Sequence, residues 1–133
     1  MDKIAIITGG NRGIGLGLAK TYHKNGYRVF SIARSQKEKI YSFEQYACDL
    51  SSTQQLRYSF KMVFSQLDKN NTSCITLINN AGRLGEVNTA ENLLPEDIEN
   101  TIQLNLTAPL QLTSMFLKLS EGWACKKSVI NIS

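Results

Sequence analysis

The residues best suited to do chemistry lie near the N-terminus, in the string Thr-Gly-Gly-Asn-Arg-Gly-Ile-Gly at positions 8–15. Glycines let a backbone turn sharply and approach a ligand closely. A helix that begins after such a turn offers free N–H groups and a partial positive charge, which suit a diphosphate. A tight turn without a ligand is the alternative. The pattern predicts a diphosphate-binding loop made of Gly9, Asn11, Arg12, Gly13, Ile14 and Gly15.

The residues on either side of this loop predict the elements that position it. Ile4–Ile7 is a short, β-branched apolar run, which is typical of a buried strand. Helical spacing of apolar residues starts near Ile14, and we expect a helix from about Asn11 or Gly13 to Lys24, with a left-handed end at Asn25-Gly26. A strand, a glycine turn and a helix form the first half of a βαβ unit.

The end of the next predicted strand, Tyr27–Ala33, bears on the choice of cofactor. In a doubly wound sheet the residue after this strand lies beside the adenosine ribose, and a carboxylate there binds the hydroxyls of NAD. This chain instead has Arg34, and a guanidinium is well shaped to hold a 2′-phosphate. Arg12 can approach the same phosphate. We therefore predict NADP(H) as the cofactor, with NAD(H) as the alternative. A further alternative is that Arg12 and Arg34 are ordinary surface residues.

The rest of the chain alternates between strand and helix patterns. Residues 35–44 are short and polar and predict a single turn plus a loop, and residues 84–93 predict a second loop. The apolar spacing predicts further strands at 45–48, 75–78 and 128–132. It also predicts helices at about 52–67 and 95–119, and Pro109 should bend the second of these.

Two motifs along the chain resemble motifs of the short-chain dehydrogenase/reductase (SDR) family. Residues 8–15 match its cofactor loop T-G-x-x-x-G-[IL]-G, and residues 79–82 are its Asn-Asn-Ala-Gly. The resemblance covers the whole chain. It implies an α/β fold with a doubly wound parallel sheet (Rossmann-like) of strand order 3-2-1-4-5. Residues 1–133 would form one NAD(P)-binding domain that lacks the C-terminal strands and helices of the full family fold.

The resemblance also implies roles for single residues. Asp49 would touch the adenine amino group, and Asn105 would belong to the catalytic set by ordering a water in the proton relay. Because Pro109 lacks an N–H, it frees the Asn105 carbonyl for that role. Asp49 as a helix cap and Asn105 as an exposed polar residue remain alternatives. The other positions implied to bind the cofactor are Leu50, Asn80, Ala81 and Gly82.

The runs I-N-N-A-G, N-L-T-A-P-L and V-I-N-I-S look similar to sepiapterin reductase-like and benzil reductase-like members of the family. Those members reduce ketones or dicarbonyls with NADPH. The resemblance therefore implies a small carbonyl or alcohol as the substrate partner.

The chain departs from the family pattern in the residues of proton transfer. Ser133 would precede the catalytic serine by one position, and no tyrosine here has a lysine four positions later. Without that acid, carbonyl reduction loses its proton donor, a loss of about 10²–10⁴ in rate. Whether the chain alone is an enzyme is therefore open. It is either the NADP(H)-binding portion of a short-chain oxidoreductase, inactive when isolated, or a non-catalytic NADP(H)-binding or protein-interaction module.

Composition excludes several other classes. The net charge is +4 with scattered basic residues, which argues against a nucleic-acid partner. No apolar run approaches the ~20 residues of a membrane-spanning helix. The three cysteines, 48, 74 and 125, lack metal-ligand spacing, so we expect no metal site and a cytoplasmic location. The apolar last strand would be an edge that another copy could pair with, so a homo-oligomer stays open.

Overall fold

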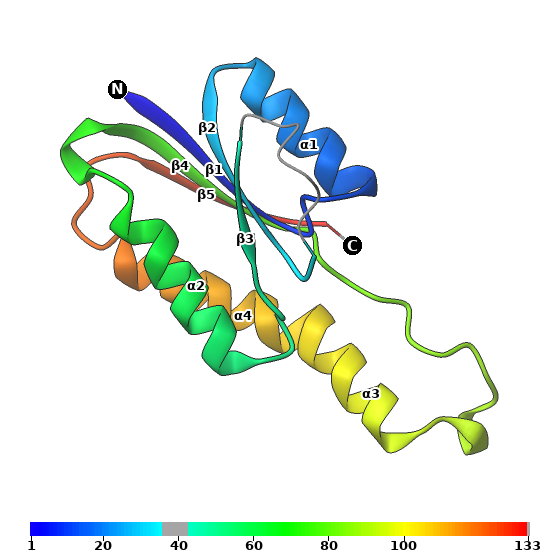
Figure 1. Ribbon diagram of the computed structural model, residues 1–133. Coiled ribbons are helices and arrows are strands. Elements are labelled where there is room, and N and C mark those ends of the chain that lie inside the picture. Colours follow the sequence, from blue (N-terminus) through cyan, green and yellow to red (C-terminus); the bar gives the residue numbers. More distant parts are fainter. Residues whose placement is uncertain (36–42, 133) are drawn as a thin grey trace.

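The computed structural model describes residues 1–35 and 43–132. Within them, five parallel strands form one sheet of order β3-β2-β1-β4-β5, which confirms the predicted order (Figure 1). The strands are β1 (Asp2–Thr8), β2 (Tyr27–Ala33), β3 (Glu44–Ala47), β4 (Thr72–Asn79) and β5 (Lys126–Asn131).

Helices cover both faces of the sheet. On one face lies α1 (Gly13–Lys24), and on the other lie α2 (Thr53–Ser65) and α4 (Ala108–Leu119) (Figure 1). Because β1 is central and covered on both faces, its run Ile4–Ile7 is buried throughout instead of alternating. As predicted, the chain leaves α1 through a left-handed Gly26 with φ +84°.

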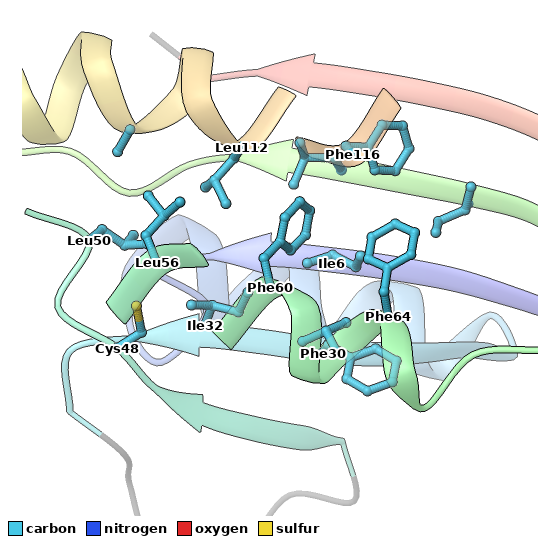
Figure 2. Close-up of a cluster of buried hydrophobic side chains, with 14 of the residues drawn as sticks. Ile6, Phe30, Ile32, Cys48, Leu50, Leu56, Phe60, Phe64, Leu112 and Phe116 are labelled. Atoms are coloured by element: carbon cyan, nitrogen blue, oxygen red, sulfur yellow. The ribbon is translucent and has the colours of Figure 1, made fainter. Parts of the chain in front are cut away.

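The larger part of the core lies between the sheet and the pair α2 and α4. The apolar stripe of α2, including Leu56, Phe60 and Phe64, packs against Phe116 of α4 and the side chains of β1 and β2 (Figure 2). Phe60 and Phe116 are fully buried. This packing fixes the ends of the strands that carry the candidate site.

The edge strand β3 is held by an ion pair. The Arg28 guanidinium donates from Nε and Nη2 to the two carboxylate oxygens of Glu44, at 2.8 and 3.0 Å. Its Nη1 donates to the carbonyl oxygen of Gln66, just after α2, at 3.0 Å. Arg28 therefore ties β3 to both β2 and α2.

The helix predicted over 95–119 is helical over that whole range, but it is not α-helical throughout. It consists of α3 (Pro95–Ile102), a π-helical segment η3 (Gln103–Thr107) and α4. The N–H of Ala108 donates to the carbonyl of Gln103, five residues back. Pro109 explains the wider turn, because it lacks an N–H and its ring clashes with the carbonyl four residues earlier. The disturbance that Pro109 predicts therefore takes the form of a π-helical segment, which lies before the proline.

Other predicted boundaries shift by a few residues. The strand predicted at 75–78 extends over Thr72–Asn79, the last strand begins at Lys126, and Leu67 lies beyond the end of α2. Cys48 follows β3 instead of ending it. A short 3₁₀ turn, Ala90–Asn92, interrupts the predicted loop 84–93. The turn predicted within 35–44 falls largely on residues 36–42, which, like Ser133, lie outside the described residues.

Candidate functional site

The candidate site lies where the carboxyl ends of β1 and β4 meet. The Thr8 hydroxyl oxygen accepts the N–H groups of Asn80 and Ala81, both at 3.0 Å. In return, the Asn80 side-chain amide donates to the carbonyls of Thr8 and Gly9, at 3.1 and 3.2 Å. The structure thus joins the glycine loop and the Asn-Asn-Ala-Gly segment, two motifs about seventy residues apart in the sequence, at the carboxyl ends of β1 and β4.

The glycine loop has the backbone that its sequence predicts. Gly9 and Gly13 have φ of +68° and +55°, which side chains rarely tolerate. A Cβ on Gly15 would lie 2.1 Å from the Gly9 carbonyl oxygen and 2.4 Å from the Asn80 amide nitrogen. Glycine at position 15 therefore allows α1 to start in direct contact with the loop.

The N-terminus of α1 is left open to an anion. Arg12 precedes the helix in extended conformation and its side chain does not cap it, and the first turn contains no acidic residue. The first N–H groups of a helix have no acceptor within it and carry partial positive charge. Ile14 is 69% exposed beside them. This end of α1 can accept a negatively charged group.

The structure brings the end of β2 to the same loop. The Asn11 side-chain amide donates to the backbone oxygen of Ser35 at 2.9 Å and to its hydroxyl at 3.1 Å. This contact places Arg34 beside the loop that carries Arg12. Both arginines are exposed, and neither side chain forms a hydrogen bond or ion pair within residues 1–35 and 43–132. Two exposed guanidinium groups thus belong to this side of the candidate site.

Asp49 and Leu50, which follow β3, belong to the same side of the candidate site as Arg34, but their side chains have different surroundings. The Asp49 carboxylate accepts the Ser51 hydroxyl at 2.6 Å and the Ser51 N–H at 3.0 Å. These hydrogen bonds, with a smaller effect of nearby Arg34, lower the pKa of Asp49. The cap of α2 is instead Ser52, whose hydroxyl accepts the Gln55 N–H. The Leu50 side chain is buried in the core, so only its backbone can face a ligand.

Asn105 lies on the other side of the crevice, in the π-helical segment. Its side-chain amide donates to the Arg83 carbonyl at 2.7 Å, and its side-chain oxygen accepts the Arg83 N–H at 2.8 Å. A Cβ on Gly82 would lie 3.2 Å from that oxygen. The side chain of Asn105 is therefore occupied in holding the chain that leaves Asn-Asn-Ala-Gly. Because Pro109 has no N–H, the Asn105 carbonyl lacks an α-helical donor.

Asn79, the first residue of Asn-Asn-Ala-Gly, forms hydrogen bonds within the sheet and to α4. It is buried, and its amide donates to the side-chain oxygens of Asn131 on β5 at 2.9 Å and Thr113 on α4 at 3.3 Å. These contacts fix the end of β5 relative to β4.

Sequence reasoning missed two contributors to the site. Thr8, which joins the two motifs, is in the sequence only the first position of the matched pattern. Arg83, which the Asn105 side chain holds and which pairs with Asp97 on α3, belongs to neither motif. The sequence does indicate Asp97 as an acidic residue in the first turn of a predicted helix. Nothing in the local sequence indicates that it pairs with Arg83.

The described residues contain no cluster of three or more histidine, cysteine or acidic side chains that could hold a metal ion. None of the helices in residues 1–35 and 43–132 has the length and apolar character needed to cross a bilayer.

Comparison with known proteins gives consistent matches. The family model described as short chain dehydrogenase matches residues 3–133. The proteins named Benzil reductase ((S)-benzoin forming) of Bacillus subtilis and Bacillus cereus are 31% and 34% identical to this chain. Each match covers 98% of this chain, and 54% and 56% of those proteins. The chain therefore spans about half the length of these relatives.

Among solved structures, a metagenomic short-chain oxidoreductase in complex with NADP superimposes with a TM-score of 0.85 at 28% identity. That match covers 98% of this chain and 61% of the other.

Proposed function

This chain belongs to the short-chain dehydrogenase family, and from that premise we propose that it forms the NADP(H)-binding portion of an oxidoreductase acting on small carbonyl or alcohol substrates. The observation that carries the proposal is the joining of the glycine loop to Asn-Asn-Ala-Gly through Thr8 and Asn80. These contacts create one continuous backbone edge, beside the open end of α1, on which a dinucleotide can lie.

The residues present fit such a cofactor. A diphosphate at the start of α1 would accept the uncapped N–H groups of residues 13–15 and meet no carboxylate in the first turn. A Cβ added at Gly13 would meet nothing within 4 Å among the described residues, so a ligand has room there. The backbone of Ala81 and Gly82 offers a flat surface to the rest of the cofactor. The proposed cofactor set is Gly9, Asn11, Arg12, Gly13, Ile14, Gly15, Arg34, Asp49, Leu50, Asn80, Ala81 and Gly82.

NADP(H) is favoured over NAD(H) by charge. Arg12 and Arg34 are exposed and adjoin Asn11 and Ser35 in the sequence, and the adenosine ribose would lie near the contact of those two residues. A guanidinium beside a 2′-phosphate forms charge-assisted hydrogen bonds that the hydroxyl of NAD cannot match. Hydrogen bonds from Ser51 lower the pKa of Asp49, and the Asp49 carboxylate can accept the adenine amino group. The metagenomic relative holds NADP and 4-hydroxyisoleucine dehydrogenase, at 26% identity, holds NADH, so the solved relatives support a nicotinamide cofactor and the preference for NADP(H) rests on the two arginines.

When bound, the nicotinamide would supply or accept the hydride. Asn105 would take part in the proton relay by presenting its main-chain carbonyl to a water, since its side chain is held by Arg83. The names of the Bacillus relatives support a ketone or dicarbonyl substrate. None of the tyrosines in this sequence has a lysine four positions later, so we expect the 133 residues alone to bind cofactor without measurable turnover.

Calorimetric titration of the chain with NADPH and with NADH tests the proposal. We expect NADPH to bind more tightly, and Arg34→Gln to weaken NADPH binding by about tenfold while leaving NADH unchanged. Arg57→Gln is the matched control, because Arg57 is also exposed but lies on α2. Tighter binding of NADH, or equal losses from both substitutions, would contradict the assignment.

A further inference from the structure

The glycine loop is attached to the end of β2 at three consecutive positions. The N–H of Gly9 donates to the carbonyl of Ile32 at 2.8 Å. Two residues later, the side-chain amide of Asn11 donates to Ser35. Gly10 lies between these two hydrogen bonds and makes the third contact, through van der Waals packing. The end of β2 therefore determines where the loop lies.

The third contact is made by the side chain of Ser31. A Cβ added to Gly10 would lie 2.5 Å from the Ser31 hydroxyl oxygen and 3.0 Å from the Ser31 Cβ, which is too close for unbonded atoms. Gly10 is not among the glycines of positive φ, so its backbone conformation is open to any residue. Glycine is therefore required at position 10 by the space that Ser31 occupies.

The hydroxyl of Ser31 has no hydrogen bond that accounts for its presence. Ser31 is 2% exposed, and within residues 1–35 and 43–132 its Oγ has no hydrogen-bond partner. Buried polar groups are nearly always paired, because an unpaired one lowers stability. The atom fills the space under Gly10 instead, so its place in the structure is that of a support for the loop.

This support bears on the two arginines proposed to hold the 2′-phosphate. Arg12 follows Gly10 by two residues, and Arg34 follows Ser31 by three. A displacement of the loop relative to β2 therefore changes the separation of the two guanidinium groups. Contacts between a guanidinium and a phosphate depend on geometry as well as charge. The diphosphate, which both coenzymes share, would instead contact the start of α1.

We propose that Ser31 is a positioning residue for coenzyme selectivity. Its side chain supports Gly10, and it thereby sets the position of Arg12 relative to Arg34 and the preference for NADP(H) over NAD(H). The inference rests on the proposed function and adds a residue outside the proposed cofactor set. Because Ser31 is buried, it acts on the coenzyme only through the loop.

Moving side-chain volume from one side of this contact to the other tests the proposal. Gly10→Ala should weaken NADPH binding by about tenfold, since overpacking by a methyl group has a cost of that order, and should weaken NADH binding less. Combining Gly10→Ala with Ser31→Gly, which removes the opposing side chain, should restore most of the NADPH affinity. Gly17→Ala is the matched control, because a Cβ there meets no described atom within 4 Å.

Ser31→Ala separates positioning from folding. It removes an unpaired buried hydroxyl, so the thermal unfolding midpoint should stay the same or rise. The ratio of the NADH to the NADPH dissociation constant should nevertheless fall by about threefold, because the phosphate contacts lose their geometry. A residue with only a structural role would change both affinities by the same factor.

The cofactor-free chain provides a readout that does not depend on coenzyme. The amide NMR signals of Gly9, Asn11 and Arg12 should shift in Gly10→Ala and return when Ser31→Gly is added. Signals that stay in place in Gly10→Ala would show that the contact does not position the loop.

Three results of the coenzyme titrations would overturn the inference. They are undiminished NADPH binding by Gly10→Ala, no restoration by Ser31→Gly, and an unchanged ratio of the two dissociation constants in Ser31→Ala. The original chain is titrated first. If it binds neither coenzyme, the proposed function fails and the inference fails with it, whereas the three results above leave the proposed function standing.

Discussion

Thr8 and Asn80 bind each other in both directions across the ends of β1 and β4. The Thr8 hydroxyl accepts the Asn80 N–H at 3.0 Å, and the Asn80 side chain donates to the Thr8 carbonyl at 3.1 Å. The same hydroxyl also accepts the Ala81 N–H. Two side chains therefore join the two segments, the Asn80 amide and the hydroxyl of Thr8, a residue that is only 2% exposed.

Replacing Thr8 by valine should destabilise the chain and loosen the crevice. Valine has the same shape but no acceptor, so the N–H groups of Asn80 and Ala81 lose their partner, at a cost of about 1–3 kcal/mol for each group left buried. Thr8→Ser keeps the oxygen and should retain most of the stability. Urea unfolding measures both variants; equal stability of Thr8→Val and Thr8→Ser would show that the hydroxyl is dispensable.

Gly15 and Gly17 lie in the same helix and should respond in opposite ways to alanine. A Cβ on Gly15 would lie 2.1 Å from the Gly9 carbonyl oxygen, so Gly15→Ala must displace α1 or the loop and should abolish NADPH binding. Gly17 has nothing within 4 Å, so Gly17→Ala should stabilise the helix by about 0.5–1 kcal/mol and leave binding intact. Thermal unfolding and NADPH titration check the pair. Unimpaired binding by Gly15→Ala would refute the close contact.

The Asp49–Ser51 contact should make part of the stability depend on pH. The Ser51 hydroxyl, and then its N–H, lowers the pKa of Asp49 below its usual 3.8. A carboxylate with a depressed folded-state pKa stabilises the fold above the unfolded pKa, and this contribution is lost as the pH falls through the folded value. Ser51→Ala should therefore be less stable than the original chain at neutral pH and equal to it at a pH below the folded-state pKa.

Urea unfolding at a series of pH values measures this difference. Asp49→Asn, which cannot titrate at this position, should remove the same part of the pH dependence. A stability difference between Ser51→Ala and the original chain that persists at the acidic end would show that the carboxylate is not its source.

Arg28 should control the local stability of the edge strand. Its guanidinium holds Glu44 of β3 and the carbonyl after α2, but both side chains of the pair are about one third exposed or more, so solvent screens it. We expect Arg28→Met to cost at most about 1 kcal/mol globally, with faster amide hydrogen exchange confined to Glu44–Ala47. Arg57→Met is the control on α2. Uniformly faster exchange over the whole sheet would instead indicate a general loss of stability.

Much of the fold could be predicted from the sequence because its signals are local. The buried run Ile4–Ile7, the left-handed Gly26 and the helix predicted at about 52–67 each depend on neighbours along the chain, and the structure contains all three. The strand order follows from the family resemblance and is likewise confirmed. The π-helical turn was only partly predictable, because Pro109 indicates a disturbance without saying on which side the helix widens.

The contacts of the candidate site were harder to predict from the sequence, because they join positions that are far apart in it. The Asn105 side chain holds Arg83, 22 residues away, and Thr8 holds Asn80, 72 residues away. Neither pair has a sequence spacing that indicates contact. Leu50 shows a different limit, since a motif match assigns it to the cofactor while its side chain packs in the core. The motif identifies the position but does not distinguish backbone from side-chain contacts.

The most direct test of the central claim is the amide NMR spectrum of the ¹⁵N-labelled chain during titration with NADPH. We predict that shift changes concentrate on residues 9–15, on Arg34 and on residues 80–82, because the diphosphate would accept N–H groups at the start of α1 and the joined loop lies beside it. An unchanged spectrum, or changes confined to the outer face of α2 around Arg57 and Lys61, would contradict a dinucleotide site at the glycine loop.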